Sequence, residues 1–180
     1  MFELDTALGT ITCAQYVLSK NLKHDEFTQQ YSNFPLITER KHVWGFEKIY
    51  EITFQIFPDQ LSTLRVAYFN QDINYIHVDA GTTSNFDWEK DGAEVEWWKV
   101  QQQWISFIRV LIHSQLGVPH QIEQPQLSDE STLLPVHDLE QLKQLEDWIY
   151  RFSWGRAGLS YVSEDYSYRF WIGYKSSGDS

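Results

Sequence analysis

Few residues of this sequence have the types and spacing that catalytic or metal chemistry requires. His77 and Asp79 are two residues apart, so on a strand their side chains would share one face. Two ligands at that spacing do not define a metal site, and the other histidines show neither an HExxH pattern nor pairing with cysteine. Cys13 is the only cysteine, and neither a G-x-S-x-G motif nor a glycine-rich phosphate loop is present. We therefore expect no catalytic residue, no metal and no cofactor.

Acidic residues offer a different chemistry, the binding of a basic partner. Between Asp87 and Glu96, five carboxylates are offset only by Lys90, and aromatic residues are interleaved with them. Exposed aromatic rings can anchor an interface while carboxylates set its association rate and selectivity. The structural alternative is that acids at a helix N-terminus are stabilised by the helix dipole, by about 0.3 to 1 kcal/mol each. The candidate partner-binding residues are Asp87, Trp88, Glu89, Asp91, Glu94 and Glu96. A second acidic segment, from Glu123 to Asp147, is better explained as a solvated loop and helix face.

The overall charge narrows the classes of partner. With 14 Lys plus Arg against 25 Asp plus Glu, the formal net charge is −11. Such a chain repels phosphate backbones and anionic lipid, so we expect a basic protein partner, no nucleic acid and no membrane. The most apolar stretch, Trp104 to Ile112, is interrupted by Arg109 and is shorter than the roughly 20 residues of a membrane span. The chain opens with acids where a secretory signal needs positive charge, so we expect a cytoplasmic protein. The alternative is that the charge serves only to keep an aromatic-rich surface soluble.

The main element that positions the first acidic segment is a predicted helix over residues 93–116. Asp91 and Glu94 have the spacing of a capping box, and Gly117 followed by Pro119 supplies a stop. Its apolar residues form two rows at helical spacing, which are Trp97, Val100, Trp104, Phe107, Ile108 and Leu111, and Trp98, Ile105 and Ile112. We therefore expect a central helix covered by a sheet on one side and by another element on the other.

The remaining periodicity predicts a single α+β domain over residues 1–180. A hairpin over 2–4 and 10–13 and a short helix carrying Phe27 and Tyr31 come first, followed by alternating strands over 52–56, 64–68 and 73–78. Residues 118–137 are expected to be a long connection, 138–149 a second helix, and 175–180 a frayed tail. The expected architecture is an antiparallel sheet packed on the long central helix, with the second helix and a C-terminal β-hairpin that either rejoins the first sheet or forms its own.

The C-terminal hairpin carries a family resemblance. The segments Phe152-Ser153-Trp154-Gly155 and Ile172-Gly173-Tyr174, with Tyr161 and Tyr168 between them, resemble the closing hairpin of small, acidic, Trp-rich bacterial immunity proteins that act on secreted toxins. The resemblance implies a non-enzymatic protein that blocks one toxin tightly, and it assigns no binding residues. The structural alternative for the same residues is an aromatic hairpin that seals the core.

The leading hypothesis is thus a non-enzymatic binding protein, an antitoxin or immunity protein that neutralises a bacterial toxin by occluding it. One alternative is a glycan-acting enzyme or lectin that uses Trp and carboxylates, which would need a Trp-lined cleft holding two carboxylates about 5 to 9.5 Å apart. A second alternative is a toxin-loading adaptor, which would bind the toxin and leave it active.

Overall fold

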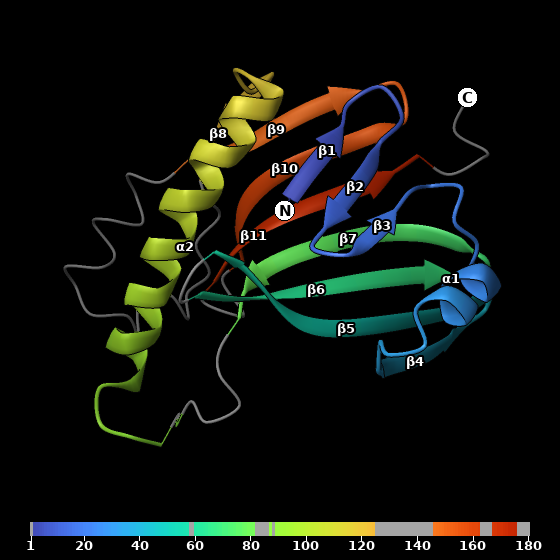
Figure 1. Ribbon diagram of the computed structural model, residues 1–180, viewed down its shortest axis with the longest axis horizontal. Coiled ribbons are helices and arrows are strands. Elements are labelled where there is room, and N and C mark those ends of the chain that lie inside the picture. The colour runs from blue at the N-terminus through green and yellow to red at the C-terminus, as the bar shows by residue number, and fades with distance from the viewer. Residues whose placement is uncertain are drawn as a thin grey trace.

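The described residues form two antiparallel sheets and two helices, and the predicted α+β class is confirmed (Figure 1). The structure is a computed structural model, and it describes residues 2–57, 60–81, 87, 89–124, 146–162 and 167–175. The elements are β1 (Phe2–Asp5), β2 (Thr10–Cys13), β3 (Tyr16–Leu18), α1 (His24–Gln30), β4 (Leu36–His42), β5 (Gly45–Phe57), β6 (Gln60–Phe69), β7 (Asp72–Ala80), α2 (Ala93–Leu116), β8 (Gln121–Glu123), β9 (Asp147–Phe152), β10 (Gly155–Val162) and β11 (Ser167–Tyr174).

The large sheet has eight strands in the order β4-β5-β6-β7-β11-β10-β9-β8. The three strands predicted from alternation are its β5, β6 and β7, and the predicted C-terminal hairpin is β10 and β11. That hairpin rejoins the first sheet, because β11 pairs with β7 and places Ile172 opposite Ile76. The sheet therefore joins residues from both ends of the chain. Strand β4 was not predicted, since its residues are almost all exposed and do not alternate.

One face of the large sheet carries the core. The small sheet β1-β2-β3 lies over it, with α1 near one end and α2 across the other (Figure 1). Phe2 of the small sheet meets Phe170 edge to face at 5.3 Å, and Phe27 of α1 meets Tyr50 at 5.1 Å. The predicted opening hairpin and short helix are both confirmed. These aromatic contacts bury one surface of the large sheet.

Helix α2 has the predicted bounds but a different start. Its N-cap is Gly92, which has a left-handed backbone (φ 83°) and makes no side-chain capping hydrogen bond, so the prediction that Asp91 caps the helix is wrong. Glycine adopts this conformation without the steric cost that a side chain would impose. At the other end Gly117 (φ 70°) donates its backbone N–H to the carbonyl of His113 at 2.9 Å, and the predicted stop is confirmed.

Helix α2 is buried along one side. Trp104 is fully buried, and its indole Nε1 donates to Ser62 Oγ of β6 at 3.2 Å. Both predicted apolar rows contribute to this side, through Trp98, Trp104, Ile105, Ile108 and Ile112. Phe107 and Val110, however, are 52% and 72% exposed. The prediction that the helix is covered on both sides is therefore wrong at these positions.

The predicted second helix over 138–149 is wrong where it can be compared. Residues 147–149 begin strand β9, which pairs with β10 and points Trp148 and Tyr150 toward the core cluster. At residues 147–149, pairing with β8 and β10 overrides the local helical period, because local propensity is weaker than tertiary packing. Residues 138–145 lie outside the described residues. The predicted connection over 118–137 contains the short strand β8, and its residues from 125 onward also lie outside the description.

The sequence also predicts turns at Pro58-Asp59 and at Glu164-Asp165, and both fall on residues that the structure does not describe. Of the expected frayed tail, only Lys175 is described, and its backbone N–H donates to the carbonyl of Trp154 at 3.1 Å. Neither helix of the described chain combines the length and apolar character needed to cross a membrane.

Candidate functional site

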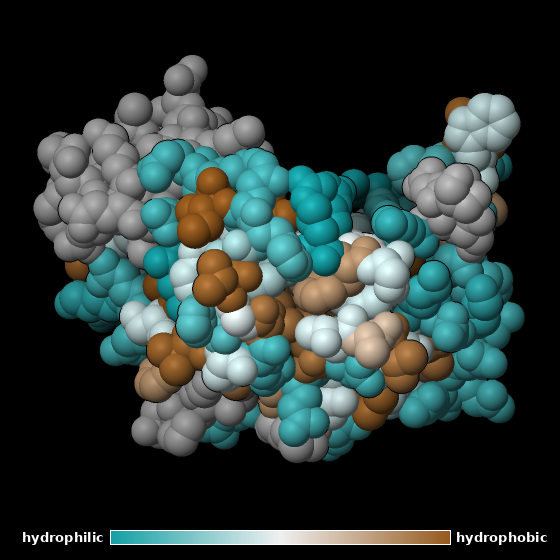
Figure 2. Space-filling model, turned by 90° about the horizontal axis from the view of Figure 1, so that it is seen from above, coloured by the Kyte–Doolittle hydropathy of each residue, from teal (hydrophilic) through white to brown (hydrophobic). Residues whose placement is uncertain are grey.

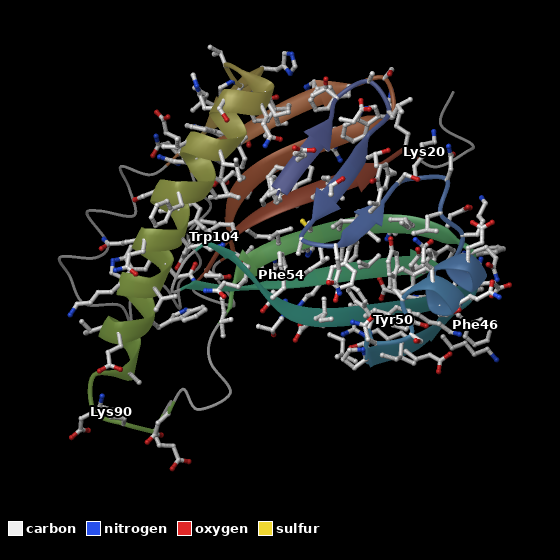
Figure 3. All side chains as sticks on the ribbon, in the orientation of Figure 1. Lys20, Phe46, Tyr50, Phe54, Lys90 and Trp104 are labelled. Atoms are coloured by element: carbon white, nitrogen blue, oxygen red, sulfur yellow. The ribbon has the colours of Figure 1, made fainter. Side chains whose placement is uncertain are left out.

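The predicted acidic segment lies before and at the start of α2. Asp87, Glu89, Asp91 and Glu96 are all exposed, while Trp88 and the side chain of Glu94 lie outside the described residues. Lys90 Nζ lies 2.7 Å from Glu96 Oε1, which neutralises one of these carboxylates. Figure 3 shows Lys90 at the tip below α2, away from both sheets. The structure therefore brings four predicted carboxylates to one protruding end of the molecule.

The aromatic residues next to these acids contribute less than the sequence suggested. Trp98 is buried in the core, and Trp97 is half-buried and packs against the core. Both belong mainly to the hydrophobic interior, which leaves Trp88 as the predicted aromatic anchor. Its role stays a prediction.

The second acidic segment is structural at its described end. Asp147 Oδ1 accepts a hydrogen bond from the backbone N–H of Tyr161 at 3.0 Å, which ties β9 to β10. Burial raises the pKa of this carboxyl above its ordinary value. The backbone carbonyl of Glu146 accepts a hydrogen bond from Arg109 Nη2 of α2 at 2.6 Å. These contacts fasten the strand and give Asp147 a structural role.

A surface that the sequence analysis missed lies at the turn between β4 and β5. Val43 and Trp44 form this turn and are 90% and 86% exposed, and Phe46 beside them is also exposed. The turn is held at its base by Asn70, whose Oδ1 accepts from the Phe46 backbone N–H at 3.0 Å and whose own N–H donates to the Phe46 carbonyl at 2.8 Å. Two large apolar side chains at the tip of a fixed hairpin are unusual on a free surface. Their only sequence signal is a Trp placed next to Gly45, outside any apolar period.

The large sheet has a second face, which is named here the open face. On β7 the residues Ile76 and Val78 enter the core, so Tyr75, His77 and Asp79 point the other way. The packing contacts recorded for α1, α2 and the small sheet all reach the core face. The open face is hollowed around Tyr75, His77, Arg151, Arg156, Trp171 and Gly173, with a volume of about 470 Å³.

The open face explains the spacing of His77 and Asp79 without a metal. Asp79 is buried and accepts a hydrogen bond from Arg169 Nε at 2.7 Å. His77 stacks on Tyr75 with ring centroids 4.2 Å apart. Burial and the nearby charges of Arg169 and Arg65 lower the pKa of His77 to about 3, so the imidazole is neutral near pH 7. Among the residues that the structure describes, no cluster of three or more His, Cys, Asp or Glu has a metal-binding arrangement.

Cys13 is a core residue, as predicted. Its side chain is fully buried in the small sheet, and burial raises the pKa of the thiol well above its ordinary value. A protonated, inaccessible thiol is a poor nucleophile.

Figure 2 views the molecule from above. On this side the apolar residues form separate groups among hydrophilic ones, and they do not merge into one continuous apolar surface.

Comparison with known proteins gives little. No family model matches the sequence, and no curated protein matches it. A matching solved structure is a chain from a complex described as "Rhs1-CT in complex with cognate immunity protein RhsI1"; it is 11% identical, the match covers 100% of this chain and 91% of that chain, and the TM-score is 0.47. A similarity of this size assigns neither a family nor a function.

Proposed function

We propose that this protein is a non-enzymatic protein-binding module that neutralises a bacterial toxin by covering its active site or its substrate surface. The observation that carries the proposal is the exposure of Val43 and Trp44 at the β4–β5 turn. Exposed aromatic side chains become anchors when a partner buries them, and truncating such an anchor costs about 2 kcal/mol or more of binding free energy.

The geometry of the hairpin favours binding. Strands β4 and β5 pair up to His42 and Gly45, and Asn70 fixes the backbone of Phe46 just beyond. Because the turn is held in one conformation, a partner that docks on Trp44 loses little free energy in ordering it. A rigid aromatic tip of this kind is suited to enter a pocket, such as the active site of an enzyme.

The acidic segment supports a basic partner. Asp87, Glu89 and Asp91 are exposed, and no opposite charge is recorded against Glu89 or Asp91 in the described part of the chain. With a net charge of −11, the whole molecule attracts a cationic protein and speeds their encounter. The labelled Lys90 and Phe46 lie at opposite ends of the molecule in Figure 3. A partner that contacts both regions must therefore extend along the protein, and a smaller partner uses one of them.

The immunity role itself rests on the resemblance of the C-terminal hairpin, and the contacts of that hairpin bear on it. Trp154 Nε1 donates to the carbonyl of Thr6 at 2.8 Å, and Tyr174 OH donates to the carbonyl of Gly9 at 2.8 Å. Phe152 stacks on Trp154 at 4.8 Å. These residues attach the small sheet to the large one, so the hairpin supports the fold and the partner surface is proposed elsewhere.

Of the two alternatives, only the glycan-acting protein requires a different site from that of an immunity protein. A glycosidase needs two carboxylates beside the sugar, but in the part of the chain that the structure describes no Asp or Glu lines the open-face hollow that contains Trp171. The toxin-loading adaptor has the same binding surface as an immunity protein and differs only in leaving the toxin active.

The proposal is tested by capture followed by mutation. The tagged full chain is used to purify partners from its native cells, and each partner is tested for toxicity to cells with and without this protein. Trp44→Ala should weaken binding about thirtyfold, which corresponds to about 2 kcal/mol. Val110→Ala, which truncates an exposed apolar side chain on α2, is the matched control and should bind like the parent. A partner that is bound but stays toxic establishes the adaptor, and full binding by Trp44→Ala removes the hairpin from the interface.

A further inference from the structure

The open-face hollow plays no part in the partner binding proposed for the hairpin and the acidic segment. Two rows of side chains cross it, one residue from each strand, as fixed by the strand register. The first row runs Arg151, Arg156, Gly173 and Tyr75, and the second runs Ile149, Gly158, Trp171 and His77. Because Gly173 has no side chain between Arg156 and Tyr75, the first row is interrupted there. This gap is the centre of the hollow.

The cations of the hollow lack acidic partners. Arg151 and Arg156 are direct neighbours on β9 and β10, and like charges in directly opposed positions destabilise a sheet. Arg151 Nη2 donates to the neutral Gln121 Oε1 at 2.6 Å, and no ion pair is recorded for Arg156 or Lys175 within the described ranges. Lys175 also lines the hollow, and no carboxylate among the described residues does. In a chain with a net charge of −11, three uncompensated cations at one site indicate an anionic ligand.

Other arginines on the same face show what a purely structural arrangement looks like. Arg65 Nε lies 2.5 Å from Glu51 Oε2, and Arg169 Nε lies 2.7 Å from Asp79 Oδ1. Each of these guanidinium groups has its carboxylate. Arg151 and Arg156 of the hollow differ from these two arginines, because no ion pair with a carboxylate is recorded for either within the described ranges.

Flat aromatic surfaces lie beside the cations. The ring of Trp171 lies against Gly158, where a Cβ atom would come within 2.5 Å of the ring, and Trp171 Nε1 donates to Ser160 Oγ at 3.0 Å. Tyr75 and His77 form a second stacked pair, with an angle of 21° between their rings. The Arg156 guanidinium lies 6.0 Å from the centroid of the Trp171 ring, so a cation and a ring adjoin each other. Fixed rings next to guanidinium groups suit a ligand that is planar at one end and anionic at the other.

We propose that the open-face hollow binds a free nucleotide. Arg151, Arg156 and Lys175 hold its phosphate, and its base packs against Trp171 or the Tyr75–His77 pair. The volume of about 470 Å³ lies within the range of roughly 300 to 1,000 Å³ that is typical of small-molecule sites. Guanidinium groups bind phosphate in a bidentate manner, and neutral His77 can exchange hydrogen bonds with a base without repelling the nearby arginines. The site is independent of the proposed toxin binding, since it lies on a different surface.

The test uses isothermal titration calorimetry of the full chain with adenosine, guanosine, cytidine and uridine monophosphates and triphosphates. Inorganic phosphate, a single-stranded oligonucleotide and a polyglutamate peptide are titrated in parallel. Gly173→Val fills the hollow, and the fold should accept it because the nearest atom to a Cβ at Gly173 is Trp171 Cζ3 at 4.0 Å. Arg156→Gln removes one cation. Lys99→Gln, at an exposed position of α2 on the core side of the sheet, is the control for the same change in charge.

The expected result is saturable binding of at least one nucleotide with a dissociation constant below about 1 mM, equivalent to about −4 kcal/mol. Arg156→Gln should weaken it at least tenfold, Gly173→Val should abolish it, and Lys99→Gln should leave it unchanged. Circular dichroism confirms folding, and if Gly173→Val unfolds, Arg151→Gln replaces it. The proposal is overturned if no nucleotide binds, if inorganic phosphate binds as tightly as any nucleotide, if the polyglutamate or the oligonucleotide alone binds, or if Lys99→Gln weakens binding as much as Arg156→Gln.

Discussion

Asp79 of β7 lies between Arg169 of β11 and Arg65 of β6, with its two carboxylate oxygens 2.7 Å from Arg169 Nε and 3.5 Å from Arg65 Nη1. These three strands form the joint at which the C-terminal hairpin rejoins the first sheet. A single buried carboxylate thus holds two cations from opposite sides of the joint, and its removal would leave both arginines facing each other.

We predict that Asp79→Asn destabilises the protein by about 3 to 5 kcal/mol, the range for breaking a buried ion pair from one side. The amide keeps the size of the side chain and removes its charge. Asp72→Asn is the control, because Asp72 pairs with Lys23 at the surface and exposed pairs contribute about 0 to 1 kcal/mol. Urea unfolding followed by circular dichroism measures both, and equal losses of stability in the two variants would contradict the prediction.

Trp104 is expected to be the most sensitive position of α2. Trp104→Ala should cost about 3 to 5 kcal/mol because it removes a fully buried large ring. Trp104→Phe keeps much of the ring and breaks the hydrogen bond to Ser62, at a cost that adds about 1 kcal/mol to the change in packing. Val110→Ala on the exposed side of the same helix should stay within about 0.5 kcal/mol of the parent. A parent-like Trp104→Ala would show that the helix does not pack as described.

How much of this could be predicted from the sequence depends on the range of the interactions. Helix α2 was predicted to the residue because its limits are set locally, by Gly117 at one end and an apolar period between. The N-cap of α2 was predicted wrongly, because Asp91 and Gly92 are both possible N-cap residues and only the backbone conformation distinguishes them. Residues 147–149 of β9 were assigned to a helix, but they pair with β8 on one side and β10 on the other, and β8 lies far from them in the sequence, outside any local window.

The two candidate sites differ in how far the sequence predicts them, and the range of the interactions is again the reason. The acidic segment is contiguous, so composition alone reveals it. The open-face hollow draws on β7, β9, β10 and β11, and the neighbourhood of Arg156 and Tyr75 exists only once the strand register is known. Trp44 was visible in the sequence, but its exposure depends on where the β4–β5 turn falls.

We predict that His77 makes the free energy of unfolding depend on pH in the acidic range. The pKa of His77 is about 3 in the folded state, whereas its ordinary value, which applies to the unfolded chain, is 6.5. Between these two pH values the unfolded chain binds a proton at His77 and the native state does not. Its contribution to stability is therefore complete above pH 6.5 and is lost as the pH falls toward 3. His77→Gln should reduce the slope of unfolding free energy against pH between pH 6.5 and 4.5. Urea unfolding at four pH values measures the slopes, and parallel curves for parent and variant would rule out this role.

Thiol reagents and chelators should leave partner binding unchanged. Cys13 is buried and protonated, so a thiol reagent should label it only in denaturant, which mass spectrometry of the native and the unfolded chain can detect. Overnight EDTA treatment tests metal dependence by the same binding assay. Labelling of the native protein, or a loss of binding that an added metal restores, would contradict the prediction.

Binding kinetics should distinguish a contact at the acidic segment from a contact at the hairpin. Neutralising Asp87, Glu89 and Asp91 together should lower the association rate with the captured partner and flatten its dependence on salt. Exposed charges act mainly on encounter, and salt screens them beyond about 8 Å at physiological ionic strength. Surface plasmon resonance at three salt concentrations measures the effect.

Removing an aromatic anchor should instead change the other rate, because desolvated contacts hold the complex together after encounter. Trp88→Ala therefore tests whether the acidic segment is in contact with the partner, and Trp44→Ala tests the same for the hairpin. If Trp44→Ala speeds dissociation while the triple variant and Trp88→Ala bind like the parent, the hairpin is the interface and the acids serve only the helix start. If only Trp88→Ala speeds dissociation and the triple variant associates slowly, the partner docks at the protruding end of α2. Because the two regions lie at opposite ends of the molecule, losses at both would require a partner long enough to span it.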